Sequence, residues 1–230
     1  MKTIGLIGGM SWESSAEYYR MINEAVKRRL GGLHSARCLM FSVDFADIEE
    51  LQRTGGWDEA ADRLADAARR LERGGAELLV LCTNTMHRVA EEVAAATEVP
   101  FIHIADPTAR EIKARGITSV GLLGTRYTME QDFYRGRLAD LHGIDVLVPD
   151  EAARALVHDV IYDELVLGRI EERSRTAFRE IMGGLVDRGA QAIILGCTEI
   201  ELLVDENDAQ VPLFDTTRIH AERAVELALG

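Results

Sequence analysis

The stretch AELLVLCTNTMH, residues 76–87, decides the fold of this 230-residue chain. Its centre, LLVLC at 78–82, is an uninterrupted apolar run of the kind that parallel strands have when both faces of their sheet are covered. The run ends on Cys82, and three small polar residues follow it. Ligands of open α/β sheets bind outside the carboxyl ends of the strands, so this thiol is predicted to face a ligand. A buried structural cysteine is the alternative, because free cysteine is among the most buried residue types.

A second copy of this pattern favours the ligand-facing interpretation. Residues 190–200 read AQAIILGCTEI and carry the same Cys-Thr pair, with Cys197 lying 115 residues after Cys82. Two more segments recur at nearly the same interval: IGLIG at 4–8 with VGLLG at 120–124, and VPF at 99–101 with VPL at 211–213. Three segments in one order at a shared period of half the chain indicate a duplicated unit.

The duplication predicts the fold class. We expect an α/β protein of two similar domains with parallel sheets, related by pseudo-two-fold symmetry, with the active site in the cleft between them. The first domain is expected at 1–104 together with 215–230, and the second at 105–214. The last helix is expected to pack back on the first domain and to tie the halves together.

The periodicity of the apolar residues predicts alternating strands and helices. The clearest helix, 57–71, has apolar residues at i, i+3, i+4 and i+7, and Gly74-Gly75 follows it as a stop signal. The expected strands are 3–7, 38–44, 78–82, 99–104, 119–123, 144–148 and the second thiol strand. The expected helices are 12–30, a short turn at 45–52, 57–71, 86–97, 125–141, 151–188 with a break near 168–169, and 215–229.

Composition excludes several classes of function. A formal net charge of −13 argues against nucleic acid as a partner, because a phosphate backbone calls for a basic surface. No apolar run approaches the length of a membrane span, and the N-terminus lacks the features of a signal peptide, so a cytoplasmic protein with no membrane partner is expected. Three cysteines then predict free thiols in a reducing compartment. Cys38 stands at the start of its strand, away from the expected cleft, and is interpreted as structural.

Two thiols that face one ligand from opposite sides suit the inversion of a stereocentre. Inversion at a carbon that carries one hydrogen needs a base on one face and an acid on the other, with the roles exchanged in the reverse direction. The pKa of a thiol, near 8.5, can be lowered so that one cysteine is a thiolate while the other stays protonated. The helix expected just after each cysteine favours the thiolate.

Small polar groups beside the thiols can hold an amino acid. Thr83, Asn84, Thr85 and Thr198 offer hydroxyls and an amide to a carboxylate or ammonium, although such groups also cap helices. The loop GGMS at 8–11 joins a strand to a helix and presents backbone N–H groups to an anion, but it is not the GxGxxG dinucleotide fingerprint. His87 is interpreted as a structural partner of the strand end.

Neither a cofactor nor a metal is expected. Pyridoxal phosphate needs a lysine for its Schiff base, and the chain has only Lys2, Lys27 and Lys113, none of which is placed in the expected cleft. The six histidines are scattered, and no CxxC or HxxxH spacing occurs.

The segments CTNT at 82–85, GCTE at 196–199 and GGMS at 8–11 together resemble the aspartate/glutamate racemase superfamily over essentially the whole chain. The resemblance implies two α/β domains, a homodimer, and racemisation without pyridoxal phosphate by two cysteines, which map onto Cys82 and Cys197. The segment 41–48, with Gln52, is similar to the broad-specificity amino acid racemase branch. The substrate-binding residues that motif and resemblance imply are Met10, Ser11, Gln52, Thr83, Asn84, Thr85, Thr198 and Glu199.

The resemblance leaves the substrate open. Dedicated aspartate racemases carry basic residues for the side-chain carboxylate, but Val166 stands near the place where a lysine is expected, and Arg53 is the other candidate. A racemase or epimerase of broad specificity, acting on an α-amino acid that is homoserine-like or otherwise non-acidic and not strictly on aspartate, is therefore the leading hypothesis. The alternatives are a related isomerase of the maleate isomerase type, a decarboxylase, which needs only one proton donor, and a non-catalytic amino-acid-binding protein. A dithiol redox role is disfavoured because CxxC spacing is missing.

Overall fold

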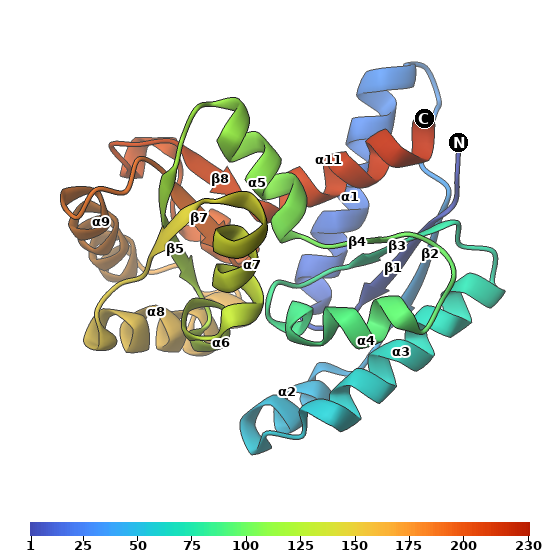
Figure 1. Cartoon of the computed structure of the whole chain (residues 1–230), viewed down its shortest axis with the longest axis horizontal. Coiled ribbons are helices and arrows are strands. Elements are labelled where there is room, and N and C mark those ends of the chain that lie inside the picture. Colours follow the sequence, from blue (N-terminus) through green and yellow to red (C-terminus); the bar gives the residue numbers. More distant parts are fainter. The chain divides into compact units, whose positions relative to one another are not determined.

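A computed structural model describes residues 1–230. The chain divides into two compact units, of which the first comprises Met1–Ile104 with His220–Gly230 and the second Ala105–Ile219. Each unit is built on a parallel sheet of four strands with helices around it (Figure 1). The predicted fold class of two similar parallel α/β units is confirmed. The domain boundaries expected from the sequence stay a prediction. The second unit extends five residues beyond residue 214.

The first unit has the strand order β2-β1-β3-β4. Its strands are β1 Ile4–Gly8, β2 Cys38–Ser42, β3 Leu78–Leu81 and β4 Phe101–Ile102. Its helices are α1 Trp12–Leu30, α2 Phe45–Thr54, α3 Trp57–Arg73, the 3-10 helix η1 Thr85–Val89, and α4 Ala90–Ala95. The central strands β1 and β3 are buried along their whole length, as a strand covered on both faces must be.

Two hydrophobic layers enclose this sheet. On one face, residues of α1 and of the His220–Gly230 end of the last helix pack against β1 and β3, with Ile22 and Val225 among the fully buried side chains. On the other face, the apolar stripe of α3, together with η1 and α4, packs against the same strands. Figure 1 shows α1 and α3 on opposite sides of the sheet. Because successive side chains of a β-strand point to opposite faces of the sheet, the same strands contribute to both layers.

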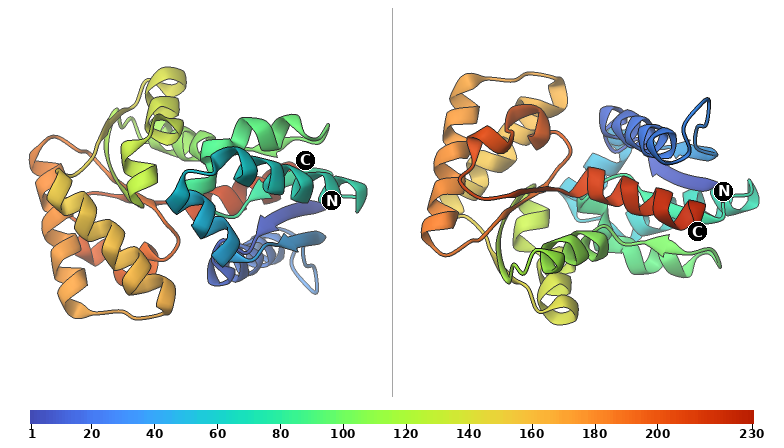
Figure 2. Two further views of the ribbon diagram at one scale, coloured as in Figure 1. Left: turned by 90° about the horizontal axis from the view of Figure 1, so that it is seen from below. Right: turned by 90° about the horizontal axis from the view of Figure 1, so that it is seen from above.

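The second unit has the strand order β6-β5-β7-β8. Its strands are β5 Ser119–Gly124, β6 Asp145–Leu147, β7 Ile193–Gly196 and β8 Leu213–Asp215. Its helices are α5 Ala105–Ala114, α6 Arg126–Glu130, α7 Asp132–His142, α8 Glu151–Asp163, η2 Leu165–Leu167, α9 Glu172–Asp187, α10 Ile200–Leu203, η3 Glu206–Asp208 and the start of α11 Thr216–Leu229. In Figure 2, α8 and α9 lie on one side of this sheet and α5 and α7 on the other.

The two units repeat each other strand for strand. Both sheets place the strand that precedes the cysteine, β3 or β7, between the first strand of the unit and a short last strand. Gly5 and Gly121 hold equivalent positions, and a Cβ on either would come within 2.8 Å or 2.6 Å of a side-chain carbon on the neighbouring strand. Each unit also receives the helix that follows the last strand of the other, because α5 follows β4 and most of α11 belongs to the first unit.

Three predicted elements differ more than the others from the structure. The helix expected at 125–141 is two helices, because Gln131 has an extended backbone with ψ near 153°. The helix expected at 86–97 begins as the 3-10 turn η1 and contains only six α-helical residues in α4. The strand expected at 99–104 has two residues, since only Phe101 and Ile102 pair with β3. Edge strands are often this short, which protects the open edge of a sheet.

None of the helices combines the length and the hydropathy that crossing a membrane requires.

Candidate active site

Cys82 follows directly on the last residue of β3. Its backbone N–H donates a hydrogen bond to the carbonyl of Ile7 on β1 at 2.9 Å, so the chain is still held by the sheet at this point. The side chain is fully buried among the apolar residues between the sheet and α1. Burial raises the pKa of the Cys82 thiol well above its ordinary value, and Cys38 nearby adds to the effect. The thiol, rather than the thiolate, is therefore the resting form.

The loop after β1 is tied to the thiol strand by small hydroxyl groups. Gly9, with φ +93°, donates its N–H to Ser15 Oγ at 2.8 Å, and Ser15 Oγ in turn donates to the Ser11 carbonyl. Ser14 Oγ donates to the Cys82 carbonyl at 3.4 Å. Glycine tolerates the positive φ that this turn requires. The first turn of α1 thus fixes the loop and the end of β3 to each other.

The predicted binding residues of the first unit gather at the carboxyl ends of β1, β2 and β3. Ser11 caps α1 by accepting a hydrogen bond from the Ser14 N–H, and Met10 packs in the apolar layer below. Gln52, on α2, is 5% exposed and donates from Nε2 to Met86 Sδ at 3.0 Å. The remaining members, Thr83, Asn84 and Thr85, continue from the thiol into η1. All six predicted residues therefore lie at the edge of the sheet where Cys82 lies.

His87 is bound on both sides of its ring. Nδ1 lies 2.8 Å from the Thr83 carbonyl, and Nε2 lies 3.1 Å from the N–H of Ile104. Because a backbone N–H can only donate, Nε2 accepts and Nδ1 carries the proton. Burial, with His103 and His220 nearby, lowers the pKa of His87 well below 6.5. The neutral His87 ring links the turn after Cys82 to the chain after β4, so its role is structural.

The neutral state of His87 predicts a loss of stability in acid. The unfolded chain binds a proton at the His87 ring near pH 6.5, but the folded protein does not. The contribution of His87 to the free energy of unfolding is therefore fully present above that pH and is lost as the pH falls. We expect the urea midpoint to fall less between pH 7.5 and pH 5 in His87→Gln than in the wild type. Equal falls in the two proteins would show that His87 stays neutral in both states or titrates in both.

Cys197 follows the last residue of β7, as Cys82 follows β3. It is half-buried, and its Sγ donates to Glu199 Oε2 at 2.9 Å. Burial raises the pKa of the Cys197 thiol, and the Glu199 carboxylate raises it further because a thiolate beside it would be a second negative charge. Thr198 shares a hydrogen bond with Thr217 between their hydroxyls at 3.1 Å, which brings the start of α11 to the thiol strand. The predicted residues of the second unit thus form one cluster.

The contact between thiol and carboxylate predicts a shift in reactivity. Replacing Glu199 by Gln removes a negative charge 2.9 Å from Sγ, so the pKa of Cys197 is expected to fall. The check is the pH dependence of alkylation by iodoacetamide, followed at each cysteine by mass spectrometry. The midpoint for Cys197 should move to lower pH, while the midpoint for the half-buried Cys38 in the same sample stays in place. An unchanged or higher midpoint for Cys197 would contradict the prediction.

Neither thiol has the helix behind it that the sequence predicts. Cys82 leads into a 3-10 turn, and Cys197 leads into the four-residue helix α10. A helix macrodipole needs aligned peptide units, and both thiols have raised rather than lowered pKa values. The structure therefore corrects the expectation that a helix N-terminus favours the thiolate at either cysteine.

Sequence reasoning missed residues on the strand beside Cys197. Gly124 at the end of β5 pairs with Gly196 at the end of β7, so Thr125 and Arg126 leave the sheet next to the thiol. The internal repeat contains the signal that finds them, because the interval of 116 residues that relates Gly5 to Gly121 also relates Met10 to Arg126. The start of α6 is thus the counterpart of the glycine loop.

These observations define a class of protein: two repeated parallel α/β units, each with a Cys-Thr pair directly after the same strand of its sheet. Comparison with known proteins gives the family. The chain belongs to the Asp/Glu/hydantoin racemase family, whose model matches residues 7–224. The resemblance seen in the sequence is confirmed, and the chain is a racemase-family enzyme.

Similar proteins support this assignment over the full length of the chain. The broad specificity amino-acid racemase RacX of Bacillus subtilis is 24% identical over 99% of this chain and 98% of its own length. A provisionally assigned Asp/Glu racemase from Yersinia pestis is 57% identical, with a TM-score of 0.95 and complete coverage of both chains. An aspartate racemase homologue from Pyrococcus horikoshii is 35% identical, with a TM-score of 0.87 and complete coverage of both chains.

Proposed function

We propose that this protein is an amino acid racemase or epimerase in which Cys82 and Cys197 act as two bases on opposite faces of the α-carbon. The observation that carries the proposal is the duplication of the thiol strand. The two sheets have the same strand order, and in each of them a Cys-Thr pair directly follows the equivalent strand. We infer from this repetition that each thiol serves one face of the same substrate.

The proposed reaction is a proton transfer at each face. One cysteine, as thiolate, removes the α-proton, the C–H electron pair stays on the carbon, and the thiol of the other cysteine delivers a proton from the opposite side. The products are the inverted amino acid and a pair of cysteines with exchanged protonation. The carbanion-like state needs donors aimed at the substrate carboxylate, and we assign this to the N–H groups of the 8–11 loop and to Thr83, Asn84, Thr85 and Thr198. Met10, Gln52 and Glu199 complete the proposed binding surface.

The raised pKa values of the two thiols fit this reaction. A thiol with a high pKa gives a strong base once it has lost its proton, and the α-proton of an amino acid is a very weak acid. A substrate ammonium group placed beside the sulfur favours the thiolate, because an opposite charge nearby lowers the pKa of an acid. The substrate therefore helps to generate the base that attacks it.

The placement of the lysines supports a reaction without pyridoxal phosphate. Lys27 ends α1 just before β2, and Lys113 ends α5 just before β5. Lys2 precedes β1. All three therefore lie toward the amino ends of the strands, opposite to the cysteines, where they cannot form a Schiff base with a ligand at the thiols.

Substrate range and assembly are part of the proposal. We propose a broad range of amino acids rather than aspartate alone, in line with the similarity to RacX. Arg53, one candidate for binding a side-chain carboxylate, is exposed and pairs with Glu49 on its own helix, and position 166 is valine.

The proposed functional form is a homodimer, which the mass measured in solution by light scattering would test.

The experiment that tests the function is proton NMR in D2O with a panel of L- and D-amino acids. The α-proton signal of a substrate is expected to disappear while the opposite enantiomer accumulates, as chiral chromatography of the same samples would show. The panel includes alanine, homoserine, glutamine, aspartate and glutamate, with maleate as a probe of the alternative isomerase. The proposal would be contradicted if no amino acid of the panel lost its α-proton signal, or if maleate were the only compound converted.

A further inference from the structure

A groove runs between the start of α8 and the last turns of α9 in the second unit. Its volume is about 260 Å³, and its lining from α9 includes Glu180, Gly184 and Arg188. The groove lies away from the thiol of this unit, because α9 ends before β7 begins whereas Cys197 follows the other end of β7. None of the residues assigned to the proposed reaction lines it.

The groove is open because position 184 has no side chain. Gly184 is four residues from Glu180 and four from Arg188, so the three positions share one side of α9. A Cβ on Gly184 would have no atom within 4 Å, and its φ is not positive. Glycine is unfavourable in the interior of a helix. Neither packing nor backbone geometry therefore requires glycine at this place.

The internal repeat shows which residue the equivalent helix of the first unit has there. The helix α3 precedes β3 as α9 precedes β7. Leu71 and Leu185 are 114 residues apart, and the carbonyl of each accepts a hydrogen bond at 3.0 Å from the N–H five residues further on. The same interval relates Gly184 to Arg70. A helix in this position thus folds with an arginine where α9 has glycine.

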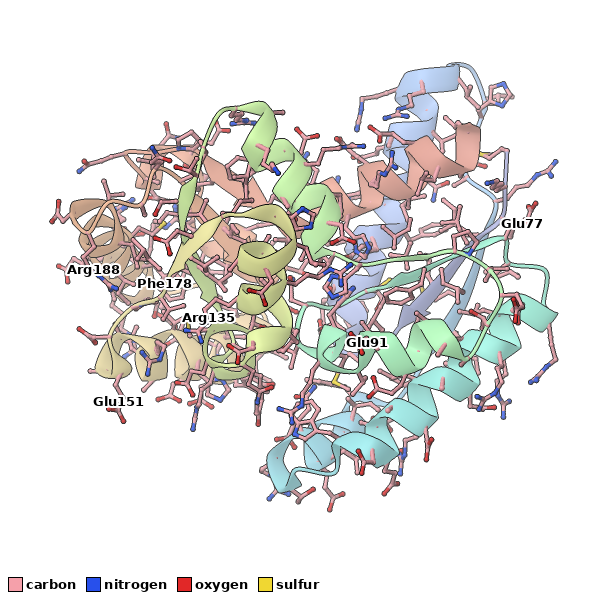
Figure 3. The ribbon with its side chains drawn as sticks, in the orientation of Figure 1. Glu77, Glu91, Arg135, Glu151, Phe178 and Arg188 are labelled. Atoms are coloured by element: carbon pink, nitrogen blue, oxygen red, sulfur yellow. The ribbon has the colours of Figure 1, made fainter.

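Both ends of the groove carry a charge. Glu180 corresponds to Asp66 of the first unit, whose Oδ2 binds Arg70 Nε at 2.6 Å. Glu180 is exposed and has no such partner, because glycine replaces the arginine. At the other end Arg188, labelled in Figure 3, donates from Nη1 to the Val148 carbonyl at 2.8 Å. This bond holds the guanidinium at the rim of the groove and leaves its other N–H groups available.

We propose that the groove binds a linear molecule with a carboxylate at one end and an ammonium group at the other, the class of the ω-amino acids. At Glu180 the ammonium group takes the place that an arginine has in the first unit. The carboxylate binds Arg188, whose N–H donors form a planar fork that suits it. The methylene chain crosses Gly184 and covers Ile181 and Leu185, which also line the groove. The site goes beyond the proposed function and does not depend on it.

Length and charge both select this class of ligand. Glu180 and Arg188 are eight residues apart, which is about 12 Å along a helix. A molecule with adjacent charges cannot reach both side chains, whereas a chain of methylene groups between the charges can. Asp150, the third charged residue of the lining, caps α8 by accepting a hydrogen bond from the Ala153 N–H at 2.9 Å. Its negative charge disfavours a dicarboxylate in the same groove.

The test uses 6-aminohexanoate, with hexanoate and hexylamine as probes that each lack one charge. Having no ammonium group on its α-carbon, 6-aminohexanoate is not a substrate of the proposed reaction. Isothermal titration calorimetry measures binding to the wild type and to Gly184→Arg, Gly183→Arg and Glu180→Gln. Gly184→Arg restores the arginine of the first unit and fills the groove. Gly183→Arg is the matched control, because Gly183 corresponds to Arg69, a Cβ there meets no atom within 4 Å, and it does not line the groove.

We expect the wild type to bind 6-aminohexanoate at least threefold more tightly than either single-charge probe. Gly184→Arg should raise the Kd at least tenfold and Glu180→Gln at least threefold, while Gly183→Arg changes it less than twofold. The urea midpoints of both arginine variants should not be lower than that of the wild type, because arginine favours a helix more than glycine does.

Three results would overturn the proposal. The first is a wild type that does not bind 6-aminohexanoate or binds the single-charge probes equally well. The second is equal weakening by Gly183→Arg and Gly184→Arg. The third is a smaller mass of Gly184→Arg than of the wild type and Gly183→Arg in light scattering, which would assign the groove to a contact between two copies of this chain.

Discussion

Cys82→Ser and Cys197→Ser are each expected to lower the rate of racemisation at least ~10²–10⁴-fold, the usual contribution of a general acid or base. Each variant should lose both directions of the reaction, because in the proposed mechanism either enantiomer needs one cysteine as base and the other as acid. Serine has nearly the shape of cysteine, but its hydroxyl is a far weaker acid and is not deprotonated at the pH values where a thiol is. The loss therefore reports on proton transfer rather than on packing.

The same mechanism predicts how the rate depends on pH. Burial raises the pKa of both thiols, so the fraction of thiolate, and with it kcat/KM, is expected to rise with pH and to keep rising above pH 8.5. The measurement is α-proton exchange and chiral analysis between pH 7 and pH 10. A rate that is independent of pH over this range would show that the base is not a thiol with a raised pKa.

Cys38→Ser is the matched control for both variants. Cys38 is the third free thiol, lies half-buried at the first residue of β2, and has its pKa raised to about 11 by burial. We expect this variant to keep the turnover of the wild type. If Cys38→Ser lost activity while one of the other two variants kept it, the two-base assignment would be wrong.

Local signals in the sequence predict the elements that short-range interactions decide. The helix expected at 12–30 is found with these bounds, because Ser11 caps its start and Gly31 ends it. The repeat interval predicts the shared strand order of the two sheets, since equivalent apolar runs must pair in equivalent ways. The fold class and the place of each cysteine directly after its strand therefore follow from sequence alone.

Features that depend on neighbours from distant parts of the chain could not be predicted in this way. The hydrogen bond from Gln52 to Met86 joins α2 to the turn after β3, across 34 residues. The raised pKa of Cys82 results from burial by α1 and the sheet together, which a helix-dipole argument from the sequence does not contain.

Gly9→Ala is expected to lower the free energy of unfolding by about 3–5 kcal/mol, from a strained backbone at positive φ together with overpacking. A Cβ on Gly9 would lie 2.2 Å from the Val43 carbonyl oxygen and 2.5 Å from the Val43 nitrogen, at a φ of +93°. No flexible side chain can move aside, because both contacts are with backbone atoms. The Val43 N–H also donates to the Gly8 carbonyl, so the strand junction must open to relieve the contact.

Gly75→Ala separates the two causes of this loss. Gly75 has a φ of +98°, but a Cβ there would have no atom within 4 Å, so only the strain of about 1–3 kcal/mol applies. Urea unfolding of both variants gives the two free energies, and the difference between them is the cost of the close approach to Val43. If Gly9→Ala lowered the free energy of unfolding no more than Gly75→Ala, the loop around Gly9 would have moved away from Val43 at little cost.

The two variants should also differ in activity. Opening the junction between Gly9 and Val43 displaces Met10 and Ser11 on one side and the start of α2, which carries Gln52, on the other. Gly75 lies just after α3, before the strand begins, so its substitution leaves the carboxyl edge of the sheet untouched. We therefore expect Gly75→Ala to keep the α-proton exchange of the wild type and Gly9→Ala to lose it even where the protein remains folded.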